Sequence, residues 1–429
     1  MLNGLLGSCA RSAGAPSWRS AVTIPGTTGT PLAGLRVVEC ASFVAGPSGC
    51  MTLGQLGADV IRVDPVGGGP DHQRWPVSDR TGESLYWTAL NKGKRSVAVD
   101  LRSPEGRELV IALATAPGRD NGLVVDNNAG RPWLSYDVLT ERRPDVIHVH
   151  IQGYADGRPA VDYTVNPEVG VPHLTGPAGS GDPVNHVLPA WDLLTGMTAV
   201  TGLLAALHRR GLSGEGTFLQ LALHDVALAG IASMGWLAEA EEQGDRARHG
   251  NHLYGSFGVD FATGDGRRVM VVALTPRQWA ALRTVTGTEK VFAALEDALG
   301  VDLDEESERF RLRETIAAVL RPWFEARELE QVTRELDAAH VLWSAYRTMA
   351  EVAAEIRAGG GSGVIGQVEQ PGIGEVLTAR LPLRRGEEYG PVAAAPRLGE
   401  HTEQVLSEVL GLGGAELGAL VDRGVIAPF

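Results

Sequence analysis

From residue 35 onwards, short apolar runs alternate with segments of helical periodicity. Continuous Val and Ile runs that alternate with helices are typical of a parallel sheet covered by helices on both faces. We therefore predict an α/β fold whose large domain is Rossmann-like. Five runs have the length and composition of buried strands: LRVVEC (35–40), DVIRVD (59–64), SVAVDL (96–101), GLVVDN (122–127) and DVIHVHIQG (145–153).

A longer apolar segment, LLTGMTAVTGLLAALHRR (193–210), predicts a helix packed inside the protein. We place its N-terminus at or just after Asp192. The run FLQLAL (218–223) then predicts a further strand. The composition shifts to Gly, His and Tyr between about residues 248 and 262, and a strand follows. We therefore divide the chain into a large domain (32–229), a smaller α+β domain with a Gly-rich loop (230–335), and a linker that returns to the large domain (336–429).

The first 31 residues differ from the rest of the chain. They contain Arg11 and Arg19 but no acidic residue, and many Ser, Gly, Ala and Thr. Such a composition is found in transit peptides and also in overextended gene starts. We expect residues 1–31 to form a disordered or non-native extension.

Composition and charge narrow the possible functions. Hydrophobic residues make up 44% and charged residues 21% of the 429 residues, which is typical of a folded globular protein. The formal net charge of -14 argues against nucleic-acid binding. No run of 18 uninterrupted apolar residues predicts a membrane span. The three cysteines form no CxxC pair, so we expect a cytoplasmic protein with neither disulfides nor a metal site.

The loop after the first strand is where a dinucleotide-binding motif would stand in a Rossmann-like domain. Its sequence, ASFVAGPSG, lacks the G-x-G-x-x-G spacing that brings pyrophosphate to a helix N-terminus. A denser positive charge lies at Lys92, Lys94 and Arg95, before the third strand, with Arg102 just after it. Such a cluster can bind phosphates, although on composition alone a solvated loop is the commoner explanation.

Asp192 stands in PAWDLLTG at the start of the predicted internal helix. A carboxylate in this position usually caps the helix by accepting backbone N–H groups. The alternative is a carboxylate nucleophile. The pattern around Asp192 does not by itself decide between the two roles.

Several motifs in order resemble the class III CoA-transferases, from about residue 31 to the end of the chain. The motifs are PLAGLRVVE (31–39), AGP (45–47), LGADVIRVD (56–64), LNKGKRSVAVDL (90–101), AWDLLTGMTAVTGLLAALHRR (190–210) and APRLGEHTEQVL (395–406). Three further segments are most similar to the branch of this family that moves CoA within one mesaconyl-CoA molecule: WLSYD (133–137), VDYTVNP (161–167) and NHVLPAWD (185–192).

The resemblance implies a ring-shaped subunit in an interlaced homodimer, an acyl-CoA substrate and no cofactor beyond CoA itself. It implies that Asp192 is the nucleophile. The Gly-rich loop is expected to close over the anhydride, and His252, Tyr254 and Gly255 are candidates for holding the free carboxylate, with ordinary loop packing as the alternative. The implied CoA contacts, with Lys94 and Arg95 from the basic cluster, are Val44, Ala45, Asp100, Leu101, Arg102, Asn127, Asn128, Arg131, Asp162 and Tyr163.

The expected reaction is CoA transfer between carboxylates through an aspartyl-CoA thioester. The racemase branch of the family pairs this aspartate with a histidine supported by a glutamate. Val161 and Thr275 stand at those positions here, and neither is a base near neutral pH. We predict intramolecular C1-to-C4 transfer on mesaconyl-CoA. Intermolecular transfer to another dicarboxylic acid and a catalytically silent CoA-binding subunit are the alternatives.

Overall fold

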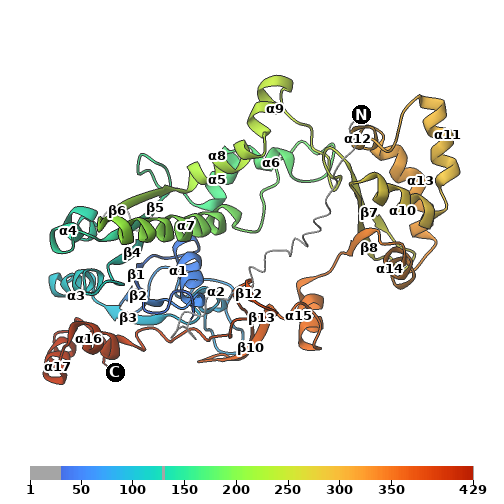
Figure 1. Cartoon of the computed structure of the whole chain (residues 1–429). Coiled ribbons are helices and arrows are strands. Elements are labelled where there is room, and N and C mark those ends of the chain that lie inside the picture. The colour runs from blue at the N-terminus through green and yellow to red at the C-terminus, as the bar shows by residue number, and fades with distance from the viewer. Residues whose placement is uncertain (1–29, 128–130, 429) are drawn as a thin grey trace, which may run out of the picture.

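A computed structural model of the chain describes residues 30–127 and 131–428 (Figure 1). The expected N-terminal extension therefore lies almost entirely outside the described residues, as does Asn128.

The large domain is built on a six-stranded parallel sheet with the strand order β3-β2-β1-β4-β5-β6. All five strands of the first series and the later strand were predicted, with ends that differ by at most two residues. The strand order reverses between β1 and β4, and ligands of open α/β sheets bind at the carboxyl ends of the strands near such a point. The strands are β1 (Arg36–Cys40), β2 (Asp59–Pro65), β3 (Arg95–Val99), β4 (Leu123–Asp126), β5 (Ile147–Gln152) and β6 (Thr217–Ala222).

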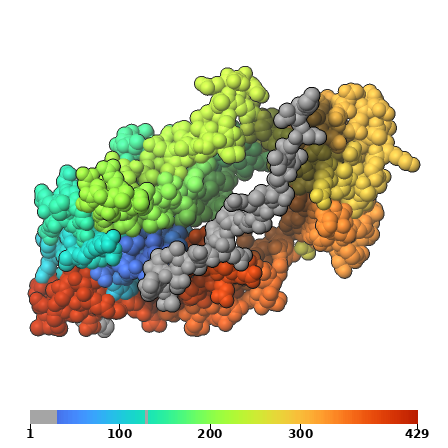
Figure 2. Space-filling view, in the orientation of Figure 1, coloured from blue at the N-terminus to red at the C-terminus, as the bar shows by residue number. Residues whose placement is uncertain are grey.

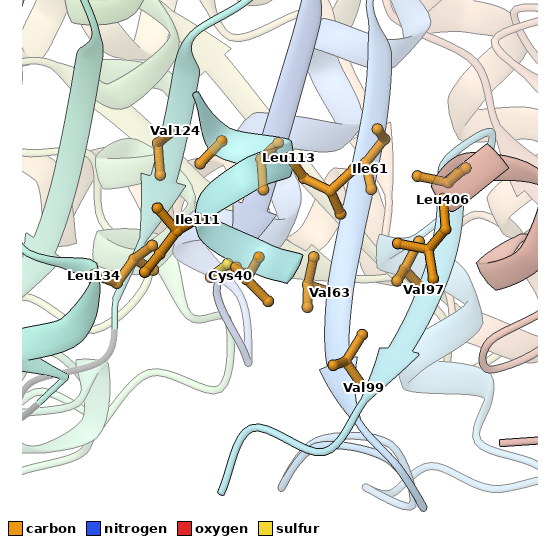
Figure 3. Packing of buried hydrophobic residues seen from close by; sticks show 14 of the residues in the cluster. Cys40, Ile61, Val63, Val97, Val99, Ile111, Leu113, Val124, Leu134 and Leu406 are labelled. Carbon is orange, nitrogen blue, oxygen red and sulfur yellow. The ribbon is translucent and has the colours of Figure 1, made fainter. Parts of the chain in front are cut away.

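Helices cover both faces of this sheet. Alternate strand residues pack on each side, so Val37 faces one helical layer and Val38 the other. Figure 3 shows the second layer, where Ile111 and Leu406 pack against the strands. One layer holds α1 (Ala45–Gln55) and α7 (Ala190–Ser213). The other holds α3 (Pro104–Ala114), α4 (Tyr136–Arg142), α16 (Thr402–Leu410) and α17 (Gly414–Asp422), so the C-terminal segment returns to this domain.

Helices α1 and α7 approach closely because glycines face each other. A Cβ atom on Gly49 would lie 2.8 Å from the carbonyl oxygen of Gly196, and one on Gly196 would lie 2.7 Å from that of Ala45. By length and composition α7 would also suit a membrane span, but it packs against α1 and β5 as a core helix does. The close approach brings the first turn of α7 to the loop after β1.

The small domain has its own core around a three-stranded antiparallel sheet. Trp279, Phe292 and Phe324 are fully buried there. The predicted boundary at residue 335 falls inside α14, because β9 still belongs to this sheet. Its elements are β7 (Phe257–Ala262), β8 (Arg268–Ala273), α10 (Pro276–Thr286), α11 (Glu289–Leu299), α12 (Glu306–Arg311), α13 (Arg313–Glu325), α14 (Leu329–Ala338) and β9 (Leu342–Ala345).

Two connections join the domains, and the described chain forms a ring with an opening between them (Figures 1 and 2). The outgoing connection contains α8 (Leu223–Ser233) and α9 (Trp236–Gln243). The returning connection contains α15 (Met349–Arg357), β10 (Ile365–Gln370), β11 (Gly374–Ala379), β12 (Arg384–Arg385) and β13 (Glu388–Tyr389). Within the large domain lie α2 (Leu85–Leu90), the short 3-10 helix η1 (Pro132–Leu134), α5 (Asp162–Glu168) and α6 (Val171–Leu174).

Candidate active site

Asp192 lies in the first turn of α7, at the carboxyl edge of the sheet. The helix begins at Ala190, earlier than predicted, so Asp192 is its third residue. The side chain is half-buried, and among the described residues none donates a hydrogen bond to its carboxylate. Burial raises the pKa of Asp192 to about 7, with the nearby Asp162 charge adding to the rise and Arg74 opposing it. A carboxylate that is partly ionised at neutral pH and has no fixed donor can act as a nucleophile.

The helix cap belongs to a different residue. Asp162, at the start of α5, accepts hydrogen bonds from the backbone N–H groups of Trp191 (2.8 Å) and Asp192 (3.2 Å). Its other oxygen lies 2.9 Å from Nε2 of His186. Asp162 is only 2% exposed, so it is anchored beneath the helix end. The capping role that competed with catalysis at Asp192 is therefore filled by Asp162.

The cap also removes the most obvious donors for transition-state stabilisation. Because Asp192 stands at the helix start, the N–H groups of the first turn are natural donors to a developing oxyanion. The structure commits them elsewhere: Trp191 and Asp192 donate to Asp162, while Ala190 and Leu193 donate to the carbonyl groups of Leu188 and Pro189. The donors to the oxyanion must come from other residues.

Arg74 and Tyr86 are candidates for these donors, because both interact electrostatically with Asp192. The Arg74 guanidinium lies 5.5 Å from the centre of the Phe43 ring and 5.4 Å from that of Tyr86. Arg74 is exposed, and no described carboxylate lies within 4.0 Å of it. Burial raises the pKa of Tyr86 to about 12, opposed by Arg74 and assisted by the Asp192 charge, so the phenol keeps its proton at neutral pH. A cation and a hydroxyl donor therefore interact electrostatically with the Asp192 carboxylate.

The loop after β1 forms the other wall of this site. Phe43 has a φ of 70°, a left-handed conformation that costs energy for a bulky residue. The loop is held from two sides, because the Phe43 N–H donates to Asp71 (2.9 Å) and Asn127 exchanges two hydrogen bonds with the backbone of Ser42. The exposed surface of the loop belongs to Phe43, which is 38% exposed, whereas Val44 and Ala45 are buried.

Lys94 and Arg95 of the basic cluster, and Arg62 of β2, form ion pairs that the sequence did not indicate. Arg62, which is 1% exposed, binds Asp64 and Asp71 at 2.8 and 3.0 Å and so fixes the carboxylate that holds Phe43. Lys94 is buried beside it and pairs with Glu39 at 2.7 Å. Arg95 pairs with Asp59 and Glu408. The expectation that Lys94 contacts a phosphate disagrees with this geometry, since its amine has no exposed surface.

Most of the other expected CoA contacts lie along one edge of the sheet. Asp100, Leu101 and Arg102 follow β3, and Asn127 follows β4. Arg102 is exposed, and its ion pair with Asp100 at 3.1 Å is a weak surface pair. The Arg102 guanidinium is therefore available to an anion. Arg131 lies over the Trp133 ring at 5.9 Å.

Tyr163, beside the buried Asp162, is 52% exposed, and its hydroxyl donates to the Val187 carbonyl at 3.4 Å. Because Asp162 is committed to the end of α7, we assign it to positioning Asp192 rather than to CoA. Tyr163 and the residues along the sheet edge stay predicted CoA contacts.

The Gly-rich loop lies at the small domain. His252 pairs with Glu314 of α13 at 3.0 Å, and Tyr254 stacks on His249 and donates its hydroxyl to Glu239. Gly255 is exposed with a φ of 81°. No described contact brings His252, Tyr254 or Gly255 to Asp192 in the single chain. Their expected role at the substrate therefore requires movement of the small domain or a second subunit.

Replacing Asp162 by Asn is expected to shift the pH dependence of turnover. The Asp162 charge raises the pKa of Asp192, so a neutral side chain lowers it. Ionised Asp192 then persists to lower pH, and the acid limb of kcat/KM moves below about 7. A pH–rate profile measures this shift, with Asp297→Asn on the exposed surface of α11 as the control. An unchanged acid limb would contradict the coupling of the two carboxylates.

Comparison with known proteins gives independent evidence on the family of the chain. The sequence pattern of CoA-transferase family III matches residues 32–402. The chain is 52% identical to the 2-methylfumaryl-CoA isomerase of Chloroflexus aurantiacus over 92% of this chain and 98% of that protein. It is 26% identical to the human succinyl-CoA:glutarate CoA-transferase, over 92% of this chain and 90% of that protein.

A solved structure has the same fold. The CAIB/BAIF family protein from Brucella suis has a TM-score of 0.72 and 26% identity, covering 89% of this chain and 99% of that one. Sequence and fold agree over nearly the whole length, so the chain belongs to CoA-transferase family III.

Proposed function

We propose that this enzyme moves CoA from C1 to C4 within one mesaconyl-CoA (2-methylfumaryl-CoA) molecule, with Asp192 as the nucleophile. The observation that carries the proposal is the state of the Asp192 carboxylate, which has a pKa of about 7 and no hydrogen-bond donor among the described residues, and which interacts with Arg74. The identity of 52% to a relative of that name supports this choice of substrate.

The first half of the proposed reaction places CoA on the enzyme. An Asp192 oxygen attacks the C1 thioester carbonyl, the carbon–sulfur bond breaks, and CoA leaves as a thiolate. The product is a mixed anhydride of Asp192 and C1. The thiolate then attacks the Asp192 carbonyl carbon, which gives an aspartyl-CoA thioester and free mesaconate.

The second half returns CoA to the other end of the same molecule. The C4 carboxylate attacks the aspartyl thioester and expels CoA thiolate, which forms an anhydride at C4. The thiolate attacks the C4 carbonyl carbon, which yields the C4 thioester and restores the Asp192 carboxylate. In each half, Arg74 holds the carboxylate that is not reacting, and the Tyr86 hydroxyl donates to the oxygen that gains charge.

The anhydrides require that water be kept out. We propose that the Gly-rich loop with His252, Tyr254 and Gly255 closes this site, in an interlaced homodimer of the cytoplasm. The ring shape of the described chain is compatible with threading by a second subunit (Figure 2). Arg102, Asn127, Arg131 and Tyr163 are proposed to contact CoA.

Labelled acid separates intramolecular from intermolecular transfer. Unlabelled mesaconyl-C1-CoA is incubated with excess labelled free mesaconate, and the C4-CoA product is analysed by mass spectrometry. We expect unlabelled product, because the acid formed on the enzyme reacts before it leaves. Substantial label in the product would instead favour an intermolecular transferase, the activity in the name of the human relative. No product at all would favour a silent subunit.

A further inference from the structure

A second cluster of reactive side chains lies on the other face of the large sheet. Asp126 ends β4, and His148 and His150 lie on β5, where Asp126 is paired in register with His150. Their side chains point to the layer of α3 and α4, because the alternate residues Val125, Ile147 and Val149 pack in the layer of α1 and α7. The cluster is therefore separated from Asp192 by the sheet.

The three side chains converge closely. Nδ1 of His150 contacts one oxygen of Asp126, and Nε2 of His148 lies 3.5 Å from the other. One ligand atom from each residue lies within 4.8 Å of the other two. A divalent ion bonded to all three at about 2.1 Å fits such a spacing after small side-chain shifts.

His148 is an unusual residue in this cluster. It is 2% exposed; Nδ1 has no hydrogen-bond partner among the described residues, and Nε2 faces Asp126 at 3.5 Å without good hydrogen-bond geometry. A buried polar group without a partner costs about 1–3 kcal/mol. Coordination of an ion by Nε2 would satisfy the nitrogen that faces Asp126.

The cluster opens on one side into a cavity of about 440 Å³. Its rim carries Arg131, Tyr136 and Gln220, and Tyr136 stacks on Phe218 at 5.1 Å. Two imidazoles and one carboxylate leave further coordination positions of an ion free. The cavity would leave room for such further ligands, and Arg131 on its rim would favour an anionic one.

We propose that Asp126, His148 and His150 bind a divalent transition-metal ion. Two nitrogen donors and one carboxylate suit Zn²⁺, Co²⁺ or Fe²⁺ better than Mg²⁺ or Ca²⁺, which take oxygen ligands. No cysteine takes part, so cysteine spacing gives no sign of the site. The proposal does not depend on the reaction at Asp192.

Metal uptake by the full-length, tag-free protein tests the site. Metal-free protein is dialysed against Zn²⁺ and its content measured by plasma mass spectrometry, and Co²⁺ binding is followed by visible absorption. We expect one tightly bound Zn²⁺ per chain and a Co²⁺ spectrum of nitrogen and oxygen ligands. Mg²⁺ should not compete. Bound Zn²⁺ should also raise the thermal midpoint of unfolding.

Variants show which residues bind the ion. His148→Ala and, as a milder change, His150→Gln should each weaken Zn²⁺ binding by about 100-fold or more. His224→Ala is the matched control, because His224 also lies near carboxylates, Glu168 and Asp225, but outside the cluster. No saturable uptake, or equal affinity in the wild type and a folded His148 or His150 variant, would overturn the proposal and leave Asp126–His150 as a simple ion pair.

Discussion

Asp192→Asn should abolish CoA transfer, with kcat/KM falling by at least about 10⁴-fold. The amide is a poor nucleophile and cannot form the anhydride or the aspartyl thioester. The fold should be retained, because Asp162 and not Asp192 caps α7 and because no described hydrogen bond to the Asp192 carboxylate is lost. Turnover is measured by chromatographic separation of the two thioester isomers, and CoA affinity by calorimetry.

Asp297→Asn on α11 is the matched control for this substitution, since it makes the same chemical change at an exposed position. It should leave turnover unchanged. If the Asp192→Asn protein binds CoA normally and still isomerises the substrate at a substantial rate, the assignment of the nucleophile is wrong.

Arg74→Met is expected to have the second largest effect, a loss of about 100-fold in kcat/KM for mesaconyl-CoA. A charge-assisted hydrogen bond contributes about 1.5–3 kcal/mol, which corresponds to about 10-fold to 150-fold. The guanidinium also lowers the pKa of Asp192, so its removal raises this pKa further above the ordinary range. Less Asp192 is then ionised at neutral pH, and the acid limb of the pH profile moves to higher pH.

The same variant separates the two roles of Arg74. The rate of aspartyl-thioester formation should be compared for mesaconyl-CoA and for an acyl-CoA that has no free carboxylate. The Arg74→Met substitution should slow the second reaction less, because only the effect on the pKa of Asp192 remains. Arg74→Lys should recover part of the activity, since it restores the charge but not the planar donor pair. Equal losses with both substrates would show that Arg74 does not bind the free carboxylate.

The strands of the large sheet were predictable from the sequence where they are buried on both faces. β1, β2 and β4 are buried at almost every position between two helical layers, and each carries adjacent apolar residues that predict a strand covered on both faces. The start of α7 was less predictable, because Ala190 and Trp191 carry no capping residue of their own and the cap comes from Asp162.

The environment of the nucleophile depends on contacts that sequence patterns do not reveal. Arg74 stands in an irregular loop, and only the fold places it beside Asp192. Lys94 was expected to bind phosphate because its neighbours are basic, but it is buried and pairs with Glu39 of β1. For the second cluster a signal did exist: His148 and His150 alternate on one strand and so share a face.

Trapping the covalent intermediate tests the central role of Asp192 most directly. The enzyme is incubated with mesaconyl-CoA, quenched with hydroxylamine and digested, and the peptide that contains Asp192 is analysed by mass spectrometry. We predict that Asp192 is converted to its hydroxamate and that other acidic residues, including Asp162, are unmodified. The mechanism would be contradicted if Asp192 stayed unmodified during active turnover, or if the hydroxamate formed on another carboxylate.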